Sequence, residues 1–366
     1  MKIVFIGYNY LPDYLTPKEF IDKIKSSAGI MEALAKMHSV IYVGQIGYEG
    51  EYSSDGVDYY FFNPKRPGYL VRSLHQFVKQ LIPDVVIVPG FHFPLQVIQL
   101  KLYLPKSVKI ILEHHGDLVP GVLRRFLQRL ADHYVDAYTF TAIGNSVDWI
   151  SYGVIKDAGK CFEVLEASTM LKQGNKTVCK AALGMIGNAN FLWVGRLNEN
   201  KDPLFVLAAF CRYHEINAGA RLYMIYQEDD MLDKVKSFIE SNELNSCVIL
   251  KGKVLHDQIA TWFSAADIYI SASKHEGSGY ALIEAMSCGC IPVVTAIPSF
   301  NKITAGGEYG FIYHPGDIIS VDQAIAKAVD STSSELPGKI KKHFLQELSF
   351  DKIAEDLNSV IVKINS

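Results

Sequence analysis

The stretch DIYISASKHEGSGYALIEAM (267–286) determines which class of fold the chain can adopt. Its first seven residues are rich in β-branched, aromatic and small side chains, which is typical of a short buried strand. KHEGSG then supplies a glycine-rich turn, and GYALIEAM has the apolar spacing of a helix. A strand that turns directly into a helix is the repeating unit of parallel α/β proteins.

The same alternation continues on both sides of this unit. The predicted strands are 2–7, 39–44, 84–90, 108–116 and 137–142 in the first half, and 190–197, 220–226, 246–252, 267–273 and 291–296 in the second. Helical spacing follows at 202–214, 229–241, 256–265 and 279–287. Nearly continuous apolar strands indicate burial on both faces of a parallel sheet. We therefore predict an α/β protein with two Rossmann-like domains facing a central cleft.

A weakly periodic stretch separates the two series. Residues 166–188 are predicted to form an interdomain linker between an N-terminal domain (1–165) and a C-terminal domain (189–345). Residues 346–366 contain a final amphipathic helix. A chain of 366 residues is long enough to build both cores.

The composition excludes several classes of protein. A net charge of −3 gives no electrostatic reason to expect nucleic-acid binding. The six cysteines form no CxxC pair, which favours a reduced, cytoplasmic chain. The sequence has no signal-peptide pattern, and prolines interrupt its longest apolar tract, 85–104, so any membrane contact is expected to be peripheral.

The turn before the helix at 279–287 has the character of an anion site. Backbone N–H groups at a helix start lack intrahelical acceptors and lie at the positive end of the helix dipole, so they attract phosphate. The groups predicted to serve here are those of Gly277, Ser278, Gly279 and Tyr280.

Two carboxylates flank this turn. Glu276 precedes it and Glu284 lies in the helix, and eight residues of helix rise about 12 Å. This is roughly the span of a diphosphate between a sugar and a ribose, and carboxylates accept hydrogen bonds from paired hydroxyls. The alternative is an ordinary helix with one acidic residue before it and one exposed glutamate.

Two cations lie at the end of the strand at 190–197 and in the loop after it. Arg196 lies at its end, and Lys201 lies just before the next helix. Together they would neutralise a diphosphate. The alternative is a solvated, charged loop.

A nicotinamide enzyme would be expected to carry GxGxxG after its first strand. The turn here is GYNYLPDYL, in which Gly7 stands alone. The dinucleotide hypothesis therefore loses its main support.

The second half resembles a known family. The segments VGRLNENKDPLFVLAAF, KGKVLHDQIATWFSAADIYISAS, KHEGSGYALIEAMSCGCIPVVTAIPS and GFIYHPGD are similar to the donor half of the family 4 (group 1) retaining glycosyltransferases, which have the GT-B fold. The resemblance runs over about residues 190–330 and is one of topology in the first half. It implies that the last helix crosses back to the first domain.

This resemblance implies roles for matching residues of the second half. Glu276 would contact hydroxyls of the donor sugar, and Glu284 would contact the ribose. Arg196 and Lys201 would bind the diphosphate. The loop that contacts the nucleotide base would be Gly252, Lys253 and Val254.

The resemblance also implies a histidine near the reacting sugar, and the match in ILEHHGDLVP (111–120) is His115. The alternative is that His114 or His115 is a structural histidine at a strand end. Asp117 is a candidate for acceptor binding.

The segment 121–135 is a basic amphipathic helix. Arg125 and Arg129 lie opposite an apolar face made of Leu123, Phe126, Leu127, Leu130 and Tyr134. Such a helix can lie on an anionic membrane. The interpretation that we favour is a helix that packs this apolar face on the sheet.

Together these features predict a metal-independent retaining glycosyltransferase. It would move a hexose-type sugar from a UDP-, GDP- or ADP-linked donor to an acceptor that is a glycan, a lipid-linked sugar or a small molecule. No cofactor and no metal are expected, and the protein is placed in the cytoplasm or at the membrane surface. The alternatives are a nucleotide-sugar epimerase and a non-catalytic protein that binds nucleotide sugars.

Overall fold

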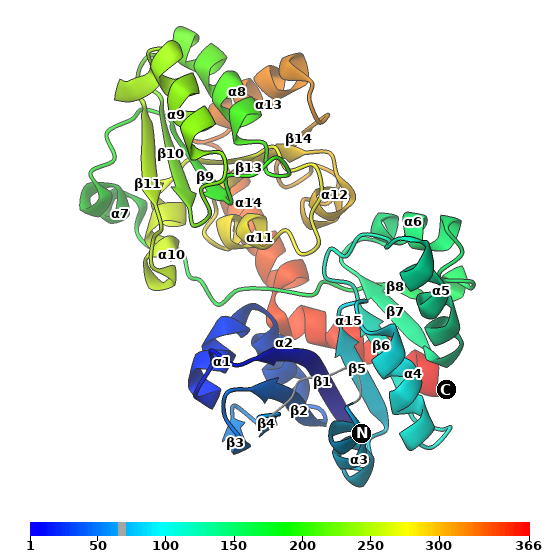
Figure 1. Cartoon of the computed structure of the whole chain (residues 1–366). Coiled ribbons are helices and arrows are strands. Elements are labelled where there is room, and N and C mark those ends of the chain that lie inside the picture. The colour runs from blue at the N-terminus through cyan, green and yellow to red at the C-terminus, as the bar shows by residue number, and fades with distance from the viewer. Residues whose placement is uncertain (65–70) are drawn as a thin grey trace. The chain divides into compact units, whose positions relative to one another are not determined.

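The computed structural model describes residues 1–64 and 71–366, and these form two compact units (Figure 1). Unit 1 consists of Met1–Ser168 together with Ser349–Ser366. Unit 2 consists of Thr169–Leu348. The predicted α/β class with two Rossmann-like sheets is confirmed.

Within the described residues, unit 1 is built on an eight-stranded sheet in the order β3-β4-β2-β1-β5-β6-β7-β8. The strands are β1 (Lys2–Leu11), β2 (Ser39–Ile46), β3 (Gly50–Ser54), β4 (Val57–Phe62), β5 (Val85–Pro89), β6 (Lys109–Glu113), β7 (Ala137–Phe140) and β8 (Cys161–Glu163). The helices are α1 (Pro17–Lys23), α2 (Lys25–Ala35), α3 (Arg72–Gln80), α4 (Pro94–Tyr103), α5 (Val122–Ala131), α6 (Val147–Ser151) and α15 (Phe350–Asn365).

The direction of winding in unit 1 reverses at β1. The chain goes from β1 to β2 on one side, and β5 pairs with β1 on the other side. Ile3 is in register with Val40 of β2 and with Val85 of β5, and all three side chains are fully buried. Ligands of open α/β sheets bind beyond the carboxyl ends of strands at such a reversal. In unit 1 this point lies at the ends of β1 and β5.

The last helix of the chain, α15, is part of unit 1 and packs against α2. The contact is so close that a Cβ on Gly29 would lie 2.6 Å from the ring of Phe350. His38 Nε2 and Asn358 Oδ1 are 2.8 Å apart and form a hydrogen bond beside this contact. Ile353 and Leu357 are buried in the same core.

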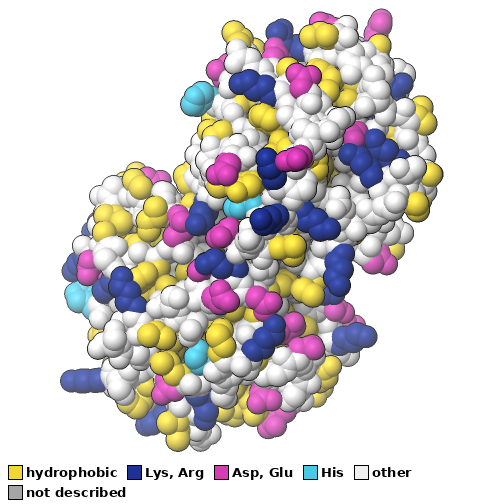
Figure 2. Space-filling model, turned by 180° about the vertical axis from the view of Figure 1, so that it is seen from behind, with side chains coloured by type: hydrophobic (Ala, Val, Ile, Leu, Met, Phe, Trp, Pro, Cys, Tyr) yellow, Lys and Arg dark blue, Asp and Glu magenta, His cyan; other side chains and the backbone are white. Residues whose placement is uncertain are grey.

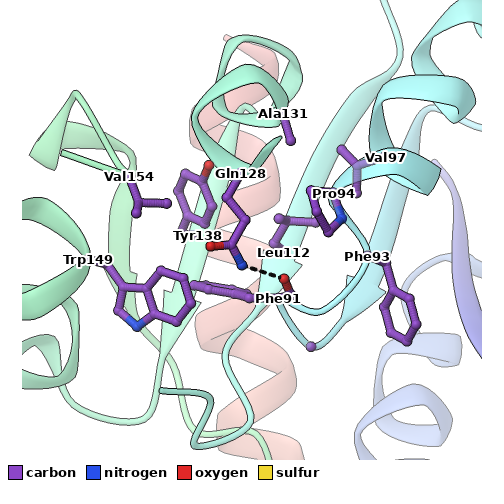
Figure 3. Close-up of a pocket in the computed structure, with 11 residues that line it drawn as sticks. Phe91, Phe93, Pro94, Val97, Leu112, Gln128, Ala131, Tyr138, Trp149 and Val154 are labelled. Atoms are coloured by element: carbon purple, nitrogen blue, oxygen red, sulfur yellow. Dashed lines mark hydrogen bonds between the residues drawn. The ribbon is translucent and has the colours of Figure 1, made fainter. Parts of the chain in front are cut away.

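Helix α5 has the opposite orientation to the one we favoured. Figure 3 shows Gln128 directed inward, where its amide donates a 2.8 Å hydrogen bond to the carbonyl of Phe91. Gln128 and Ala131 are buried, whereas Leu123 and Phe126 are 82% and 56% exposed. The expectation that the apolar face packs on the sheet is therefore wrong. A small side chain and a partnered amide allow α5 to lie close to the sheet.

Unit 2 contains a six-stranded parallel sheet among the residues described, in the order β11-β10-β9-β12-β13-β14. The strands are β9 (Asn190–Gly195), β10 (Arg221–Tyr226), β11 (Val248–Gly252), β12 (Ile268–Ser271), β13 (Ile291–Thr295) and β14 (Phe311–Tyr313). The helices are α7 (Lys176–Leu183), α8 (Pro203–Ile216), α9 (Leu232–Ser241), α10 (His256–Ala265), α11 (Tyr280–Ser287), α12 (Pro298–Ile303), α13 (Ile318–Asp330) and α14 (Leu336–His343).

The segment predicted as a linker, 166–188, contains helix α7. Asn175 caps its first turn by accepting a 3.1 Å hydrogen bond from the N–H of Val178, and Gly184 ends it in the left-handed conformation. Lys180 ion-pairs with Asp267 at 3.1 Å, and α7 packs on α10. The helix is short, and its attachment depends on partners distant in sequence, so the segment has little periodicity of its own.

Two further findings concern the chain as a whole. All six cysteines are free thiols. Within residues 1–64 and 71–366, no helix combines the length and the apolar character that crossing a membrane requires.

Candidate functional site

The carboxyl ends of β9 and β12 form the point of reversal in unit 2. The chain runs from β9 outward to β10 and β11, and then returns to β12 on the other side of β9. The loops after β9 and β12 therefore lie side by side. These loops carry most of the residues that the sequence singled out.

Lys201 and Glu276 form an ion pair between these loops. Their side chains are 21% and 13% exposed, so the pair is largely shielded from water. The hydroxyl of Ser299 donates hydrogen bonds to the carbonyls of Glu276 at 2.7 Å and Gly277 at 3.1 Å. The carboxylate of Glu276 is thus held on a supported loop.

Asn200 joins the same two loops. Its side-chain amide donates to the carbonyl of His275 at 3.0 Å, and its oxygen accepts from the N–H of His275 at 3.1 Å. Lys274 adds an ion pair with Asp202 at 3.1 Å. This double hydrogen bond fixes the loop that bears Lys201 relative to the loop that bears Glu276.

The glycine-rich turn leads into α11 as predicted. Gly279 is the residue before the helix and has φ +62°, a conformation that disfavours residues with a Cβ. A Cβ there would also lie 2.6 Å from Cδ1 of Ile303. Gly277 and Ser278 are half-buried, and the first amides of α11 follow at Tyr280. The turn therefore has the backbone geometry of an anion site.

Glu284 is buried inside α11 and is paired at the surface with a histidine. Its Oε1 lies 3.1 Å from Nε2 of His256, and the hydroxyl of Tyr280 lies 3.4 Å from the same nitrogen. Burial, with a further contribution from the Glu284 carboxylate, raises the pKa of Tyr280, which stays protonated at neutral pH. Glu284, His256 and Tyr280 thus form one polar cluster.

The two predicted cations contact different carboxylates. Arg196 is 64% exposed, and its Nε lies 3.3 Å from Oε1 of Glu228 in the loop after β10. Lys201 contacts Glu276 instead. The backbone of Glu228 accepts a 3.0 Å hydrogen bond from Leu197, which holds the Arg196 loop against the β10 loop.

The third predicted loop follows β11. Gly252 ends this strand with φ +65°, Lys253 is exposed and Val254 is half-buried. Two residues later His256 begins α10. The loop therefore leads directly to the Glu284 cluster.

In unit 1, His115 follows β6 and is held by two carboxylates. Its Nδ1 pairs with Glu166, and its Nε2 lies 3.8 Å from Oε2 of Glu113. Burial alone would lower the pKa of His115, but Glu166 and Glu113 outweigh it and raise this pKa well above its usual value. His115 is therefore an imidazolium at neutral pH.

The neighbouring histidine and aspartate have structural contacts. His114 is 1% exposed, and its Nε2 donates to the carbonyl of Asp117 at 2.9 Å. The carboxylate of Asp117 accepts a 2.9 Å hydrogen bond from the N–H of Phe91 and pairs with His92. Asp117 therefore holds two loops together, which differs from the acceptor contact suggested for it.

A pocket of about 280 Å³ opens beside His115 in unit 1, at the carboxyl ends of β1, β5 and β6. Its polar lining comes from Asn9, Lys23, Ser26, Ser27, Glu113, His115 and Glu166. The larger part of its wall is apolar and includes Phe5, Phe20, Ile30, Met31, Tyr42 and Phe93. It lies where the reversal of the sheet predicts a ligand.

Sequence reasoning did not identify four residues of these clusters. Glu113 stands two residues before His115, and strand alternation places both on one side, so this signal was available. Glu166 lies in the stretch predicted as a linker. Asn200 and His256 act through partners 75 and 28 residues away, and local spacing does not reveal such contacts.

Residues 187–343 match the family described as glycosyl transferases group 1. The group 1 match covers β9 to α14, and so it includes every residue of unit 2 described in the loops above.

Among individual relatives, an alpha-monoglucosyldiacylglycerol synthase of Streptococcus pneumoniae is 24% identical over 187 residues, which are 51% of this chain and 41% of the relative. A GDP-mannose:cellobiosyl-diphosphopolyprenol alpha-mannosyltransferase of Xanthomonas oryzae is 29% identical over 140 residues, 38% of this chain and 37% of the relative. The chain thus aligns with less than half the length of these two relatives.

Solved structures resemble the fold over nearly the whole chain. Anabaena HepE in complex with UDP has a TM-score of 0.74 at 14% identity, covering 99% of this chain and 100% of that one. Sucrose-phosphate synthase of Thermosynechococcus elongatus has a TM-score of 0.72, also at 14% identity, covering 99% of this chain and 98% of that one. These neighbours confirm the GT-B class of the fold.

Proposed function

We propose that the chain is a metal-independent retaining glycosyltransferase of family 4 that uses a nucleotide-diphosphate sugar. The observation that carries the proposal is the arrangement in unit 2 of the Lys201–Glu276 pair, the turn before α11 and the buried Glu284. The group 1 match over residues 187–343 supports it. So does the similarity to an alpha-monoglucosyldiacylglycerol synthase and to an alpha-mannosyltransferase.

In this proposal each group of unit 2 holds one part of the donor. The backbone amides of the turn from Gly277 to Tyr280 bind the diphosphate, and Lys201 and Arg196 neutralise it. Glu284 accepts hydrogen bonds from the ribose, while Glu276 accepts them from the hexose. Gly252, Lys253 and Val254 contact the base. Two cations and a helix start supply the positive charge that a diphosphate leaving group requires.

In this proposal unit 1 supplies His115 and binds the acceptor. The imidazolium of His115 can donate a hydrogen bond to a sugar hydroxyl, because Glu166 and Glu113 keep it protonated. The pocket beside it is where we place the acceptor. The acceptor hydroxyl attacks the anomeric carbon on the face that the nucleoside diphosphate leaves, and a donor phosphate oxygen takes its proton.

Two alternatives remain outside this proposal. A nucleotide-sugar epimerase would change a donor sugar without any acceptor, and chromatography of the nucleotide-sugar pool would show it. A non-catalytic binding protein would need neither the His115 cluster nor the adjoining pocket. The names of the relatives favour transfer over both.

We also propose a cytoplasmic location with peripheral membrane contact through residues 121–135. The support is the exposure of the α5 face, where Val122, Leu123 and Phe126 are 81%, 82% and 56% exposed. Arg124 and Arg129 are exposed on the same helix. Figure 2 shows acidic and basic side chains interspersed over one face of the molecule.

The function is tested by thermal shift with UDP, GDP, ADP and their glucose and mannose conjugates. A ligand that binds only the folded protein raises the melting temperature. The nucleotides that carry one of the three bases should raise the melting temperature by several degrees. Lys201→Met should abolish this rise. Lys236→Met, an exposed lysine on α9, is the matched control and should respond like the wild type. A wild type that responds to no nucleotide would overturn the proposal.

A further inference from the structure

The pocket of unit 1 has two chemically different ends. Its polar end is formed by Glu113, His115 and Glu166, after β6 and β8. Its apolar end lies between β1 and helices α1 and α2, which are neighbours in Figure 1. Any molecule that fills the pocket therefore meets hydrogen-bonding groups at one end and hydrocarbon at the other.

The apolar end belongs to the ordered core. Phe5, Phe20, Ile30 and Met31 line it and are each less than 5% exposed, and the ring of Phe20 packs on Tyr42 at 5.3 Å between centroids. An apolar cavity of 150 Å³ can hold benzene, so about 280 Å³ has room for an aryl ring or a folded alkyl chain. A purely polar sugar would leave this wall without a partner.

The polar end is close to electrically neutral. The Nδ1 of His115 pairs with Glu166 and its Nε2 lies 3.8 Å from Glu113, so an acidic side chain stands on each side of the one imidazole ring. Lys23 adds one positive charge at the exposed edge of the lining. An anionic group placed beside His115 would be repelled by both glutamates. A hydroxyl there would instead find acceptors in the carboxylates and in Asn9 and Ser26.

We propose that the acceptor is an uncharged hydroxyl compound that bears an alkyl or aryl group, with its hydroxyl at His115 and its apolar group against Phe20 and Met31. This rests on the proposed function, because it assigns the acceptor class of the same enzyme. An anionic amphiphile, such as a phosphorylated lipid, has the same apolar group but would require free positive charge near His115.

The test measures binding to the full-length protein directly, by saturation-transfer NMR and calorimetry, without any sugar transfer. The probes are methyl, hexyl and octyl β-D-glucoside and octyl phosphate, each below the concentration at which it forms micelles. Affinity should rise several-fold from the methyl to the octyl glucoside, because each added methylene buries apolar surface. Octyl phosphate should bind at least tenfold more weakly than octyl glucoside.

Two variants localise the binding. Ser26→Leu adds bulk inside the pocket and keeps the backbone carbonyl of Ser26 that accepts from Ser168 at 3.0 Å, so it should fold and bind octyl glucoside at least tenfold more weakly. Ser73→Leu makes the same change on the exposed side of α3 and should bind like the wild type.

Each contrary result overturns the proposal. Tighter binding of octyl phosphate, lost in Lys23→Ala, would assign an anionic acceptor. Equal affinity for all three glucosides would mean that the apolar wall is not used. Equal loss in Ser26→Leu and Ser73→Leu would place binding elsewhere. A failure here, with nucleotides still raising the melting temperature, leaves the transferase proposal standing.

Discussion

His115 is the residue whose charge state depends most directly on its neighbours. Replacing Glu166 by Gln removes the carboxylate that contributes most to the raised pKa of His115, so this pKa should fall. An NMR titration of the imidazole C–H signals measures the change. Glu163→Gln is the control, since Glu163 contacts Ile143 and should leave the titration unaltered. An unchanged titration in Glu166→Gln would show that Glu166 does not control the charge of His115.

The same pair predicts how stability depends on pH. Unfolded histidine has a pKa of about 6.5, and the folded value is higher. Between the two values the folded protein holds one more proton than the unfolded chain, so the free energy of unfolding falls as pH rises. The total loss should be smaller than a fully buried ion pair would give, because the side chain is 35% exposed and solvent screens it. Urea unfolding from pH 6 to 9 should show this fall, and Glu166→Gln should flatten it.

The Lys201–Glu276 pair predicts a difference between two ligands of unit 2. Glu276→Gln frees Lys201 for a phosphate, so binding of the nucleoside diphosphate alone should stay equal or become tighter. Binding of the nucleotide sugar should weaken about 10- to 100-fold relative to binding of the nucleoside diphosphate. The reason is that the charge-assisted hydrogen bonds from the sugar to the Glu276 carboxylate, which contribute about 1.5–3 kcal/mol, are lost. Calorimetry with both ligands, and Glu199→Gln on the same loop as the control, tests this. Parallel losses for both ligands would rule out a sugar contact for Glu276.

Local sequence patterns predicted where individual residues of unit 2 lie relative to its strands and helices, because turns and caps depend on residues a few positions apart. Glu276, Gly279 and Lys201 follow strands, as the sequence indicated. The pairing between them was not predictable, since the order of β9 and β12 in the sheet decides it. The same holds for Glu166, which follows β8 and reaches His115 after β6 because these strands are separated only by β7 in the folded sheet.

Among the elements, the start of α11 depends on a glycine that can be tested against a matched glycine. Gly279 and Gly184 have φ of +62° and +64°, but a Cβ at Gly279 would meet Ile303 at 2.6 Å, whereas at Gly184 it would meet nothing within 4 Å. Gly184→Ala should cost about 1–2 kcal/mol for the left-handed backbone alone. Gly279→Ala should cost about 1–3 kcal/mol more because of the clash, and it should also weaken nucleotide binding. Urea unfolding measures both free energies. Equal stability of Gly279→Ala and Gly184→Ala would contradict the predicted effect of the clash.

Helix α5 shows how a correct element can be assigned to the wrong environment. The sequence predicted a helix over 121–135, and α5 spans Val122–Ala131. Periodicity reports only that a helix has an apolar face, and not what covers this face. In the structure, Gln128 has a partner in the carbonyl of Phe91, which allows the polar side to pack inward. Such a partner comes from a loop 37 residues away and leaves no signal in the helix itself.

The exposed face of α5 predicts membrane binding without a role in stability. The double variant Leu123→Ser, Phe126→Ser should change the free energy of unfolding by less than about 0.5 kcal/mol, since both side chains are exposed. It should lower binding to phosphatidylglycerol vesicles at least fivefold in a co-sedimentation assay. Ile216→Ser, at an 86% exposed residue ending α8, should leave vesicle binding intact. Equal binding by the double variant and the wild type would remove the membrane proposal.

At the scale of the whole molecule, the chain builds unit 1 from both of its ends. The first 168 residues supply the sheet, and Ser349–Ser366 adds α15 to the same unit. The amphipathic pattern of the last segment predicted the helix, and only the resemblance to a known family suggested where it goes. Helical spacing alone cannot specify the partner of α15. The surface of α2 that contacts it consists mainly of Gly29 and apolar side chains, and many helices present such a surface.

This organisation predicts that a destabilising substitution in α15 lowers the stability of unit 1. Leu357 is 1% exposed within the core of that unit, and Leu357→Ala should lower its stability by about 2–5 kcal/mol. Hydrogen exchange followed by mass spectrometry should then show faster exchange in β1, β2 and α2, while β9 and β12 of unit 2 stay protected. Leu345→Ala, at a 59% exposed position in unit 2, is the control and should change neither pattern. Faster exchange in unit 2 alone, or unchanged exchange in β1, would mean that α15 does not belong to the cooperative core of unit 1.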